Sequence, residues 1–323
     1  MKALIINDIV GAHIIGLHRT QIDHISYEGR LVCDISSIPP VATYSETTNY
    51  DIITINIHNI NCKTIQYYDS FILKHTPDMI IITSPNPAYI TLPEHHKFKK
   101  VIEYIEETWN YILAGLPKNH TFDMHTFMVD PSDFGSNITE GNTYIIGYHK
   151  DKFMPHSNTI RKAKLPKTNN RAFPTPLREK LTLPYHRPWL YLTQKQANHL
   201  KTQQAEYMII NNETFIPALT IDEMLDKDEY TLVQDDSWQV QQVNQTKVNK
   251  EGYRFPHPAL YRRLRGYETY ACMDTEGVDG YALSGYIPKA FPPDYYVHSL
   301  DLHPLLFIFD KYVNKLRELT RRI

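Results

Sequence analysis

The chain has 323 residues, of which 42% are hydrophobic, and its 34 basic and 36 acidic residues give a net charge of −2. A chain of this length buries a large core and suggests one large α/β domain with a smaller companion. The balanced charge excludes a protein that binds nucleic acid through overall basicity, although it allows a local basic face. We expect no membrane partner, because no run of 18 apolar residues occurs.

Cysteine usage and overall composition bear on the source and location of the protein. The three cysteines are too few and too scattered for a disulfide framework or a zinc site, so we expect a cytoplasmic protein without a metal. Many Ile, Asn, Lys and Tyr residues with only 12 glycines are typical of an AT-rich genome, such as that of a phage or a low-GC bacterium.

The first part of the chain alternates short apolar segments with segments of helical periodicity. We expect strands at residues 3–6, 22–27, 51–57 and 79–82, and helices at residues 9–17, 62–75 and 98–113. Two more strands, at residues 121–129 and 142–147, are expected to pair antiparallel across the turn between them. This alternation predicts an α/β fold with a Rossmann-like, doubly wound sheet.

The composition changes after residue 150, which indicates a domain boundary. Residues 150–180 are rich in Pro, Lys and Arg, and the region that follows is polar and carries an acidic run at residues 222–229. Residues 305–319 then return to helical periodicity. We therefore expect an α/β domain made of residues 1–165 and 254–323, with a smaller inserted domain at residues 166–253.

The segment at residues 50–87 is expected to carry the functional site. Its pattern of apolar residues predicts a strand, a loop, a helix, a second strand and a second loop, which together form a βαβ unit. Ligands of open α/β sheets bind outside the carboxyl ends of the strands. The loops at residues 57–63 and 83–87 are therefore the expected position of the site.

Several short motifs, taken in their order along the chain, point to one family. They are IINDIVG at residues 5–11, the acidic Glu28, the string CDI at residues 33–35, the long segment FPTPLREKLTLPYHRPWLYLTQKQANHL, and the late strings YRRLRGYET and SGYIPKAFPP. In order and spacing they resemble the DNA cytosine-5 methyltransferase family over nearly the whole chain. The resemblance implies a class I methyltransferase-like sheet, a target-recognition-like inserted domain and a DNA partner.

The resemblance places S-adenosylmethionine at Gly11, Glu28 and Asp34, with the two acids on its ribose and adenine. In this family a glycine turn lets the backbone approach the cofactor. Asp8 and Val10 stand where glycines belong, and Asp8 would bring a carboxylate toward the carboxylate of the ligand. We therefore expect these three positions to be vestigial and no cofactor to bind, with S-adenosylmethionine as the alternative.

The catalytic motifs of the family are replaced in the same way. The Pro-Cys nucleophile falls on His58 and Asn59, the glutamate that holds the base falls on Thr83 and Ser84, and the paired arginines fall on Glu140 and Asn142. None of these side chains can do the corresponding chemistry. Because the nucleophile, the acid, the arginines and the glycine turn differ together, we predict a methyltransferase-like fold that does not methylate.

Two other segments keep an active enzyme open as an alternative. Cys62 follows the expected nucleophile position, and a lengthened loop could present its thiol, although a buried cysteine at a helix start explains it as well. The string from Asn86 to Tyr89 is similar to the proline-rich catalytic loop of amino methyltransferases, whose Asn and aromatic side chains grip an extruded base. Either site would serve an S-adenosylmethionine-dependent DNA methyltransferase.

Basic residues cluster in two segments that border the DNA cleft in the family. They are Arg161, Lys162, Lys164, Lys167 and Arg171 in the linker and Arg262, Arg263 and Arg265 in the late motif. Such side chains neutralise phosphates, although a solvated loop has the same composition. The leading hypothesis is an inactive protein that binds DNA, a partner methyltransferase or both. A protein-interaction scaffold or decoy without nucleic-acid binding is the third alternative.

Overall fold

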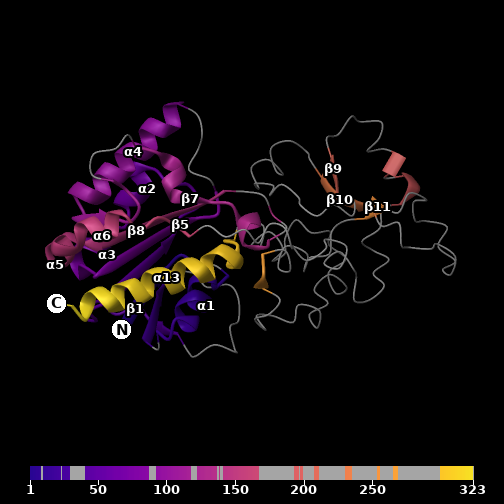
Figure 1. The fold of residues 1–323 in the computed structure, drawn as a ribbon. Coiled ribbons are helices and arrows are strands. Elements are labelled where there is room, and N and C mark those ends of the chain that lie inside the picture. Colours follow the sequence, from indigo (N-terminus) through magenta and orange to yellow (C-terminus); the bar gives the residue numbers. More distant parts are fainter. Residues whose placement is uncertain are drawn as a thin grey trace.

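The computed structural model describes a main α/β body and parts of a second region (Figure 1). The described residues are 1–8, 10–22, 24–29, 41–86, 92–117, 122–136, 138, 141–166, 193–195, 197–198, 207–210, 230–234, 253–254, 265–267 and 299–322. Within these residues no helix combines the length and the apolar character that are needed to cross a bilayer.

A mixed sheet forms the centre of the main body. Its strands are β1 (Lys2–Ile6), β2 (His24–Glu28), β3 (Ala42–Thr43), β4 (Ile52–Asn56), β5 (Met79–Ser84), β6 (Tyr111–Leu113), β7 (Met128–Val129) and β8 (Asn142–His149). The order across the sheet is β3-β2-β1-β4-β5-β8-β6, and β7 pairs with one end of β8. The strands β3, β2, β1, β4 and β5 are parallel to one another, whereas β8 runs antiparallel to both β5 and β6.

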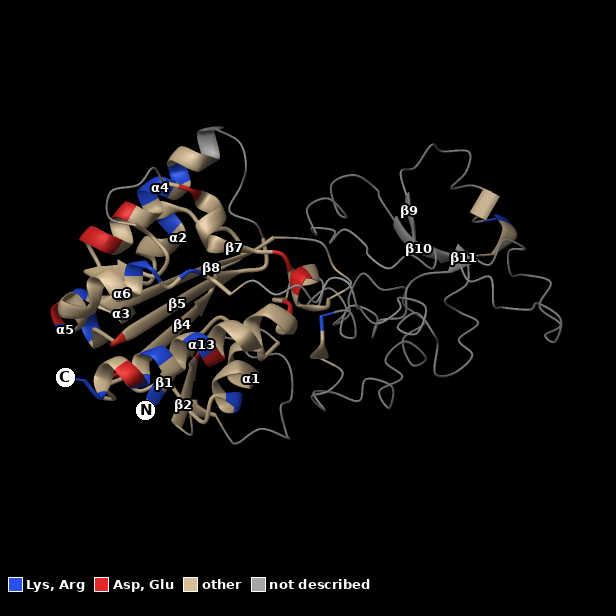
Figure 2. Ribbon diagram, in the orientation of Figure 1, with Lys and Arg blue, Asp and Glu red and all other residues tan. Residues whose placement is uncertain are grey.

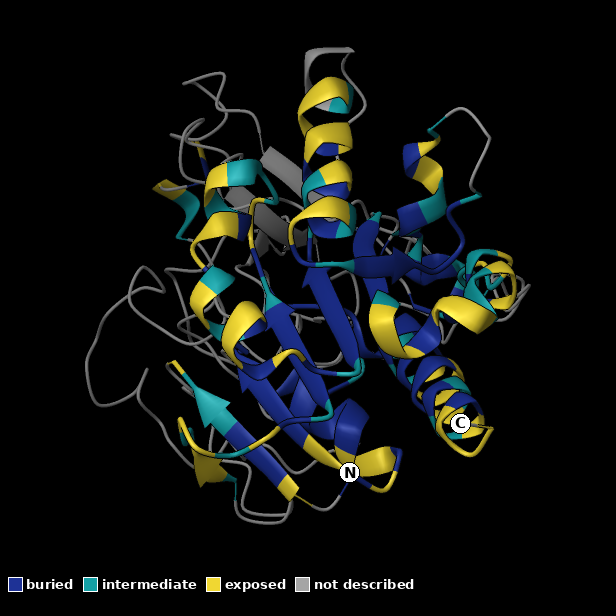
Figure 3. Ribbon diagram, turned by 90° about the vertical axis from the view of Figure 1, so that its left-hand side faces the viewer, coloured by how far each residue is buried: buried dark blue, intermediate teal, exposed yellow. Residues whose placement is uncertain are grey.

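Helices cover both faces of this sheet, so the predicted doubly wound fold is confirmed. The helices are α1 (Ala12–Arg19), α2 (Cys62–Gln66), α3 (Asp69–His75), α4 (Leu92–Glu107), α5 (Lys150–Phe153), α6 (Ser157–Arg161) and α13 (Leu302–Thr320). Neighbouring strand residues point to opposite faces: Ala3 and Ile5 join the core under α1 and α13, while Leu4 and Ile6 join the core under α2 and α4. Figure 3 shows the central strands buried and the outer helix surfaces exposed.

Helix α13 completes one of the two cores. It packs along α1, where Gly16 allows a close approach, because a Cβ at this position would lie 2.9 Å from both Leu305 and Phe309. The Tyr148 hydroxyl of β8 donates to the Tyr312 carbonyl at 3.1 Å. A helix expected at residues 305–319 is therefore present, and it belongs to the same body as β1 (Figure 1).

Several predicted elements differ from the structure. The helix expected at residues 98–113 ends at Glu107, because Asn110 adopts a φ of 66° and Tyr111 then enters β6 opposite His149. The helix expected at residues 62–75 is split into α2 and α3 at Tyr67 and Tyr68.

The expected strand at residues 121–129 is mostly a 3-10 turn, η1 (Met124–Phe127). Asp123 starts this turn, because its side chain accepts a hydrogen bond from the His125 backbone N–H at 2.9 Å. Only β7 remains extended, and its antiparallel pairing with β8 confirms that part of the prediction. Two further 3-10 turns are η2 (Pro131–Phe134) and η3 (Met154–His156).

A second, three-stranded sheet lies in the later part of the chain. It consists of β9 (Tyr207–Ile210), β10 (Tyr230–Gln234) and β11 (Tyr253–Arg254), with β10 parallel to β9 and antiparallel to β11. These strands fall in or next to the segment for which the sequence predicts a separate domain. The boundaries of that domain, at residues 166 and 253, stay a prediction.

Candidate functional site

In the turn between β1 and α1, the side chain of Asp8 binds backbone groups at the start of the helix. Asp8 is fully buried and accepts backbone N–H groups of Ala12, His13 and Ile14 at 3.0, 2.7 and 3.3 Å. Burial raises the pKa of Asp8 to about 7, although these N–H groups act in the opposite direction. The carboxylate is therefore directed into the first turn of α1, and the expectation that it would face a bound ligand is wrong.

A hydrogen bond links the end of β1 to the residues between α2 and α3. Asn7 follows β1 with a φ of 58°, and its side-chain amide donates to the Tyr68 hydroxyl at 2.6 Å. Its Oδ1 lies against Gly29, where an added Cβ would be only 2.8 Å away. Asn7 therefore lies between the end of β2 and the start of α3.

Of the three residues predicted to bind the cofactor, the structure describes two. Gly11 has a φ of 77° and forms the N-cap of α1, and Glu28 lies half-buried at the end of β2. Asp34 lies outside the described residues. The N–H groups at the start of α1, which would receive an acidic ligand group, already bind Asp8. The described residues therefore do not fit S-adenosylmethionine as a whole.

A chain of hydrogen bonds between polar side chains joins α1 to the ends of β5 and β4. His13 Nε2 lies 2.8 Å from Thr83 Oγ1, which donates to Asn56 Oδ1 at 3.3 Å. Because the Thr83 hydroxyl proton is directed to Asn56, His13 must donate its Nε2–H, and burial lowers the pKa of His13 to about 3. Thr83, at which the sequence resemblance placed the family's glutamate, is thus a fully buried member of an internal network. No sequence motif indicated the part played by His13.

The two loops predicted to carry the catalytic residues bind each other. The His58 carbonyl accepts the Ser84 hydroxyl at 2.8 Å and the Asn86 side-chain amide at 3.0 Å, and the Asn86 backbone N–H donates to Ser84 Oγ at 3.1 Å. The side chains of His58 and Asn59 are exposed. The structure therefore brings together His58 and Ser84, as predicted, but their contact consists of structural hydrogen bonds.

Strand β8 holds the same loop from the other side. The Asn142 side-chain amide donates to the Pro85 carbonyl at 2.9 Å, and the Thr143 hydroxyl donates to the Asn86 carbonyl at 2.8 Å. Asn142 is fully buried, and its Oδ1 accepts the backbone N–H of Asp301 at 3.4 Å. Glu140 and residues 87–89 lie outside the described residues. Asn142, placed at a family arginine, thus ties together three segments that are distant in the sequence.

Cys62 begins α2 and packs toward the core. Asn61 and Thr64 form a capping box around this helix start, with Asn61 Oδ1 accepting the Lys63 and Thr64 backbone N–H groups. The side chain of Cys62 is half-buried against the apolar cluster that includes Ile65 and helix α4. This placement corresponds to the cysteine at a helix start that the sequence also allowed.

The predicted basic residues have different environments. Arg161 is held by Glu106 at 2.8 Å and by the Leu116 carbonyl at 3.1 Å, and Arg265 is 1% exposed. Lys162 and Lys164 are exposed. Lys167, Arg171, Arg262 and Arg263 lie outside the described residues. Of the described four, the two lysines present their charge to solvent.

A buried acid at the start of α13 was not singled out from the sequence. Asp301 accepts the Ser136 hydroxyl at 2.6 Å and the backbone N–H and Nδ1 of His303 at 2.9 and 2.7 Å. Burial acts to raise the pKa of Asp301, but His303, Ser136 and Arg265 outweigh burial and lower it. Ser136 and the buried Arg265 therefore meet at the N-terminus of α13. A Ser or Asp before a helix predicts such a cap, but the sequence does not give the distant partners.

The strand order, with β8 antiparallel between β5 and β6, defines a Rossmann-like fold of the class I methyltransferase type. Comparison with solved structures agrees with this class. The Schizosaccharomyces pombe Dnmt2 methyltransferase matches with a TM-score of 0.57 and 11% identity over 98% of both chains. A Spodoptera frugiperda DNMT2 mutant has a TM-score of 0.56 and 10% identity over 98% of this chain and 99% of its own.

A third structure, the Entamoeba histolytica methyltransferase EhMeth, has a TM-score of 0.53 and 9% identity over 98% of both chains. No protein-family model matches the sequence, and a search of curated protein sequences found no match either. At such low identity the comparisons show the fold. They confirm, at the level of structure, the cytosine-5 methyltransferase resemblance that the motifs suggested.

Proposed function

We propose that the chain is a catalytically inactive cytosine-5-methyltransferase-like protein that binds DNA, a partner methyltransferase or both. One observation carries the proposal: the positions where the family places its nucleophile and its acid are joined by hydrogen bonds, through the His58 carbonyl, Ser84 and Asn86. A base-binding pocket would need a nucleophile and a carboxylate directed at a substrate from these positions. Here Ser84 and Asn86 hold the two loops together, and the exposed side chains of His58 and Asn59 supply no nucleophile.

The cofactor side supports the same proposal. Because Asp8 binds the N–H groups at the start of α1, a ligand carboxylate would have to displace a buried group that is already hydrogen-bonded. We infer that no cofactor is needed. Glu28 remains at the end of β2, so weak binding of S-adenosylmethionine is the outcome against which this inference is tested.

DNA binding is proposed for the basic linker and the late basic motif. Lys162 and Lys164 are exposed, and Lys167, Arg171, Arg262 and Arg263 belong to the same two segments of the sequence. Arg161 and Arg265 would support these segments from inside the fold. We propose that residues 1–165 and 254–323 form one domain and residues 166–253 a target-recognition-like domain, in a protein of the cytoplasm.

Calorimetry and a methyl-transfer assay test the inactive assignment. The full chain is titrated with S-adenosylmethionine and with its demethylated product, and transfer of a labelled methyl group to duplex DNA is measured separately. We expect no binding at micromolar concentrations and no transfer. Methyl transfer that disappears in Cys62→Ser, or in Asn86→Ala, would overturn the proposal in favour of a rebuilt active site.

DNA binding is tested separately by the fluorescence anisotropy of a labelled duplex at low salt. We expect binding that weakens steeply as salt is added, because phosphate contacts release counterions. If the duplex does not bind at low salt, the nucleic-acid part fails, and a protein-interaction scaffold or decoy is then the better description.

A further inference from the structure

Helices α6 and α13 and the segment that follows α6 line a cavity that is open to solvent on the flank of the main body. Its volume is about 300 Å³, and the described residues that line it are Thr159, Lys162, Ala163, Lys311, Tyr312 and Lys315. Three of these six are lysines, and none is acidic. Figure 2 shows basic residues on α13 and around α6.

The wall of this cavity is fixed in place by hydrogen bonds. The buried Tyr312 donates its hydroxyl to the Ala163 carbonyl at 2.8 Å, and its own carbonyl accepts Tyr148 of β8. This bond joins α13 to the segment after α6. Lys311 and Lys315 are four residues apart on α13 and therefore lie on the same side of the helix. The three lysines thus line a hollow whose wall is held by these hydrogen bonds.

The ammonium groups around the hollow have few anionic partners. Lys311 donates to the Lys164 carbonyl at 2.5 Å and lies 5.5 Å from the centre of the Tyr312 ring. Lys315 meets Glu318 at 3.1 Å, an ion pair at the surface whose acid is 56% exposed. Among the described residues, Lys162 has no carboxylate partner. Each ammonium group carries three N–H donors, so several donors are left for a ligand.

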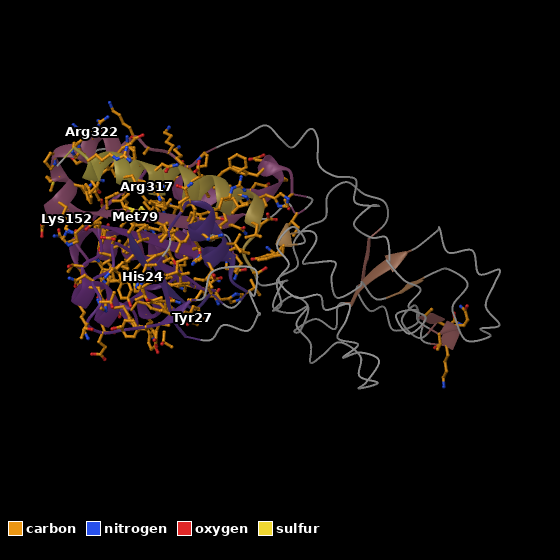
Figure 4. The ribbon with its side chains drawn as sticks, turned by 90° about the horizontal axis from the view of Figure 1, so that it is seen from below. His24, Tyr27, Met79, Lys152, Arg317 and Arg322 are labelled. Atoms are coloured by element: carbon orange, nitrogen blue, oxygen red, sulfur yellow. The ribbon has the colours of Figure 1, made fainter. Side chains whose placement is uncertain are left out.

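The partial burial of Lys311 favours the binding of an anion beside it. Partial burial lowers the pKa of Lys311, which means that its charge loses hydration without gaining a carboxylate. A bound anion would supply both the missing charge and acceptors for the remaining N–H groups. Further basic residues follow along the chain: Figure 4 shows Arg317, on α13, and Arg322, just after the end of this helix.

We propose that the cavity lined by Lys162, Lys311 and Lys315 binds a phosphate group, supplied by the backbone of nucleic acid or by a small phosphorylated molecule. The nucleic-acid form of this proposal rests on the proposed DNA binding and extends it from the linker to α13. Continuity favours phosphate over an acidic protein, because Lys162 and Lys164 begin the basic linker for which DNA contacts are proposed.

A pair of double variants tests the proposal in the full chain. Lys162→Gln with Lys315→Gln removes two charges from the cavity, and Lys99→Gln with Lys100→Gln removes two exposed charges from α4 as the matched control. Binding of a labelled DNA duplex is measured by anisotropy over a series of salt concentrations. Binding of inorganic pyrophosphate is measured by phosphorus NMR.

We expect the cavity variant to lower the slope of log affinity against log salt by about 2, since each phosphate contact contributes about 0.9. We also expect it to abolish saturable pyrophosphate binding, while the control behaves as the unchanged protein. Loss of pyrophosphate binding alone supports the small-molecule source. If the unchanged protein binds pyrophosphate but no DNA, the cavity proposal stands and the DNA part of the proposed function fails.

The proposal is overturned by either of two results. One is that the unchanged protein binds neither DNA nor pyrophosphate. The other is that the cavity variant and the α4 control lose affinity equally, which would show an effect of net charge alone. Urea unfolding of both variants checks that neither loses its fold.

Discussion

The strands of the main sheet and the loops at their carboxyl ends differ in what determines their structure. Strand β5 is buried along its whole length, and its apolar side chains alternate between the two cores. The loop after β5 depends on single hydrogen bonds from Ser84, Asn142 and Thr143. The fold of the methyltransferase-type sheet therefore rests on burial, whereas the position of the loop after β5 rests on a few polar contacts.

The largest expected effect on stability comes from the core that α13 completes on one face of the sheet. Two phenylalanines of α13 test it. Phe309 is fully buried and packs against Gly16 and the His13 ring, whereas Phe307 is 47% exposed. We expect Phe309→Ala to lower the free energy of unfolding by about 3–5 kcal/mol. Phe307→Ala, the matched control, should cost about 1 kcal/mol or less. Urea unfolding measures both, and equal losses would contradict the described packing.

An intermediate effect concerns the pH dependence of stability at the turn before α1. Between about pH 4 and 6.5 the folded protein holds a protonated Asp8 and a neutral His13, because their pKa values are about 7 and about 3. The unfolded chain holds a charged Asp8 and a charged His13 over this range. Each state binds one proton, so the pair contributes almost no slope of stability against pH.

In the unchanged protein the contributions of Asp8 and His13 to the slope of stability against pH cancel, so each single variant should show the slope of the residue that remains. Asp8→Asn leaves His13, to which only the unfolded chain binds a proton, so stability rises with pH between about 4 and 6.5. His13→Gln leaves Asp8, to which only the folded chain binds a proton, so stability falls as pH rises from about 4 to 7. Each slope approaches about 1.4 kcal/mol per pH unit. Slopes of the same sign in urea unfolding would refute this account.

The smallest expected effect lies in the loop that binds across the strand ends. Ser84→Ala removes one donor and one acceptor and should lower the free energy of unfolding by about 1–2 kcal/mol. Ser70→Ala, at an exposed serine of α3, is the control and should change it by about 0.5 kcal/mol or less. Hydrogen exchange of the Asn86 amide should increase only in Ser84→Ala. Unchanged exchange would mean that the loop is held by other contacts.

The sequence predicted the sheet region well because burial leaves a periodic pattern. The apolar run of β5 and the spacing of α13 both follow from which residues face the core. The break at Asn110 was missed because a single residue with positive φ gives no periodic signal. The bonds that Asn142 makes to Pro85 and Asp301 join distant segments, so spacing could not predict them.

The candidate site was predictable in position but not in its contacts. Strand order placed His58 and Ser84 near each other, and the structure agrees. The inward direction of Asp8 depends on where α1 begins, and the sequence predicted that start at residue 9, whereas the helix begins at Ala12. The line from His13 through Thr83 to Asn56 depends on three elements meeting, which no local motif records.

The packing of α13 on α1 has a consequence for the order of events during synthesis. The apolar side of α1 is covered by Leu305 and Phe309, which the ribosome adds long after α1 itself. At about 5–20 residues per second the intervening chain takes roughly 15–60 s to make. For that time the apolar side of α1 lacks the residues that cover it in the folded protein. The core under α1 can close only after α13 has emerged.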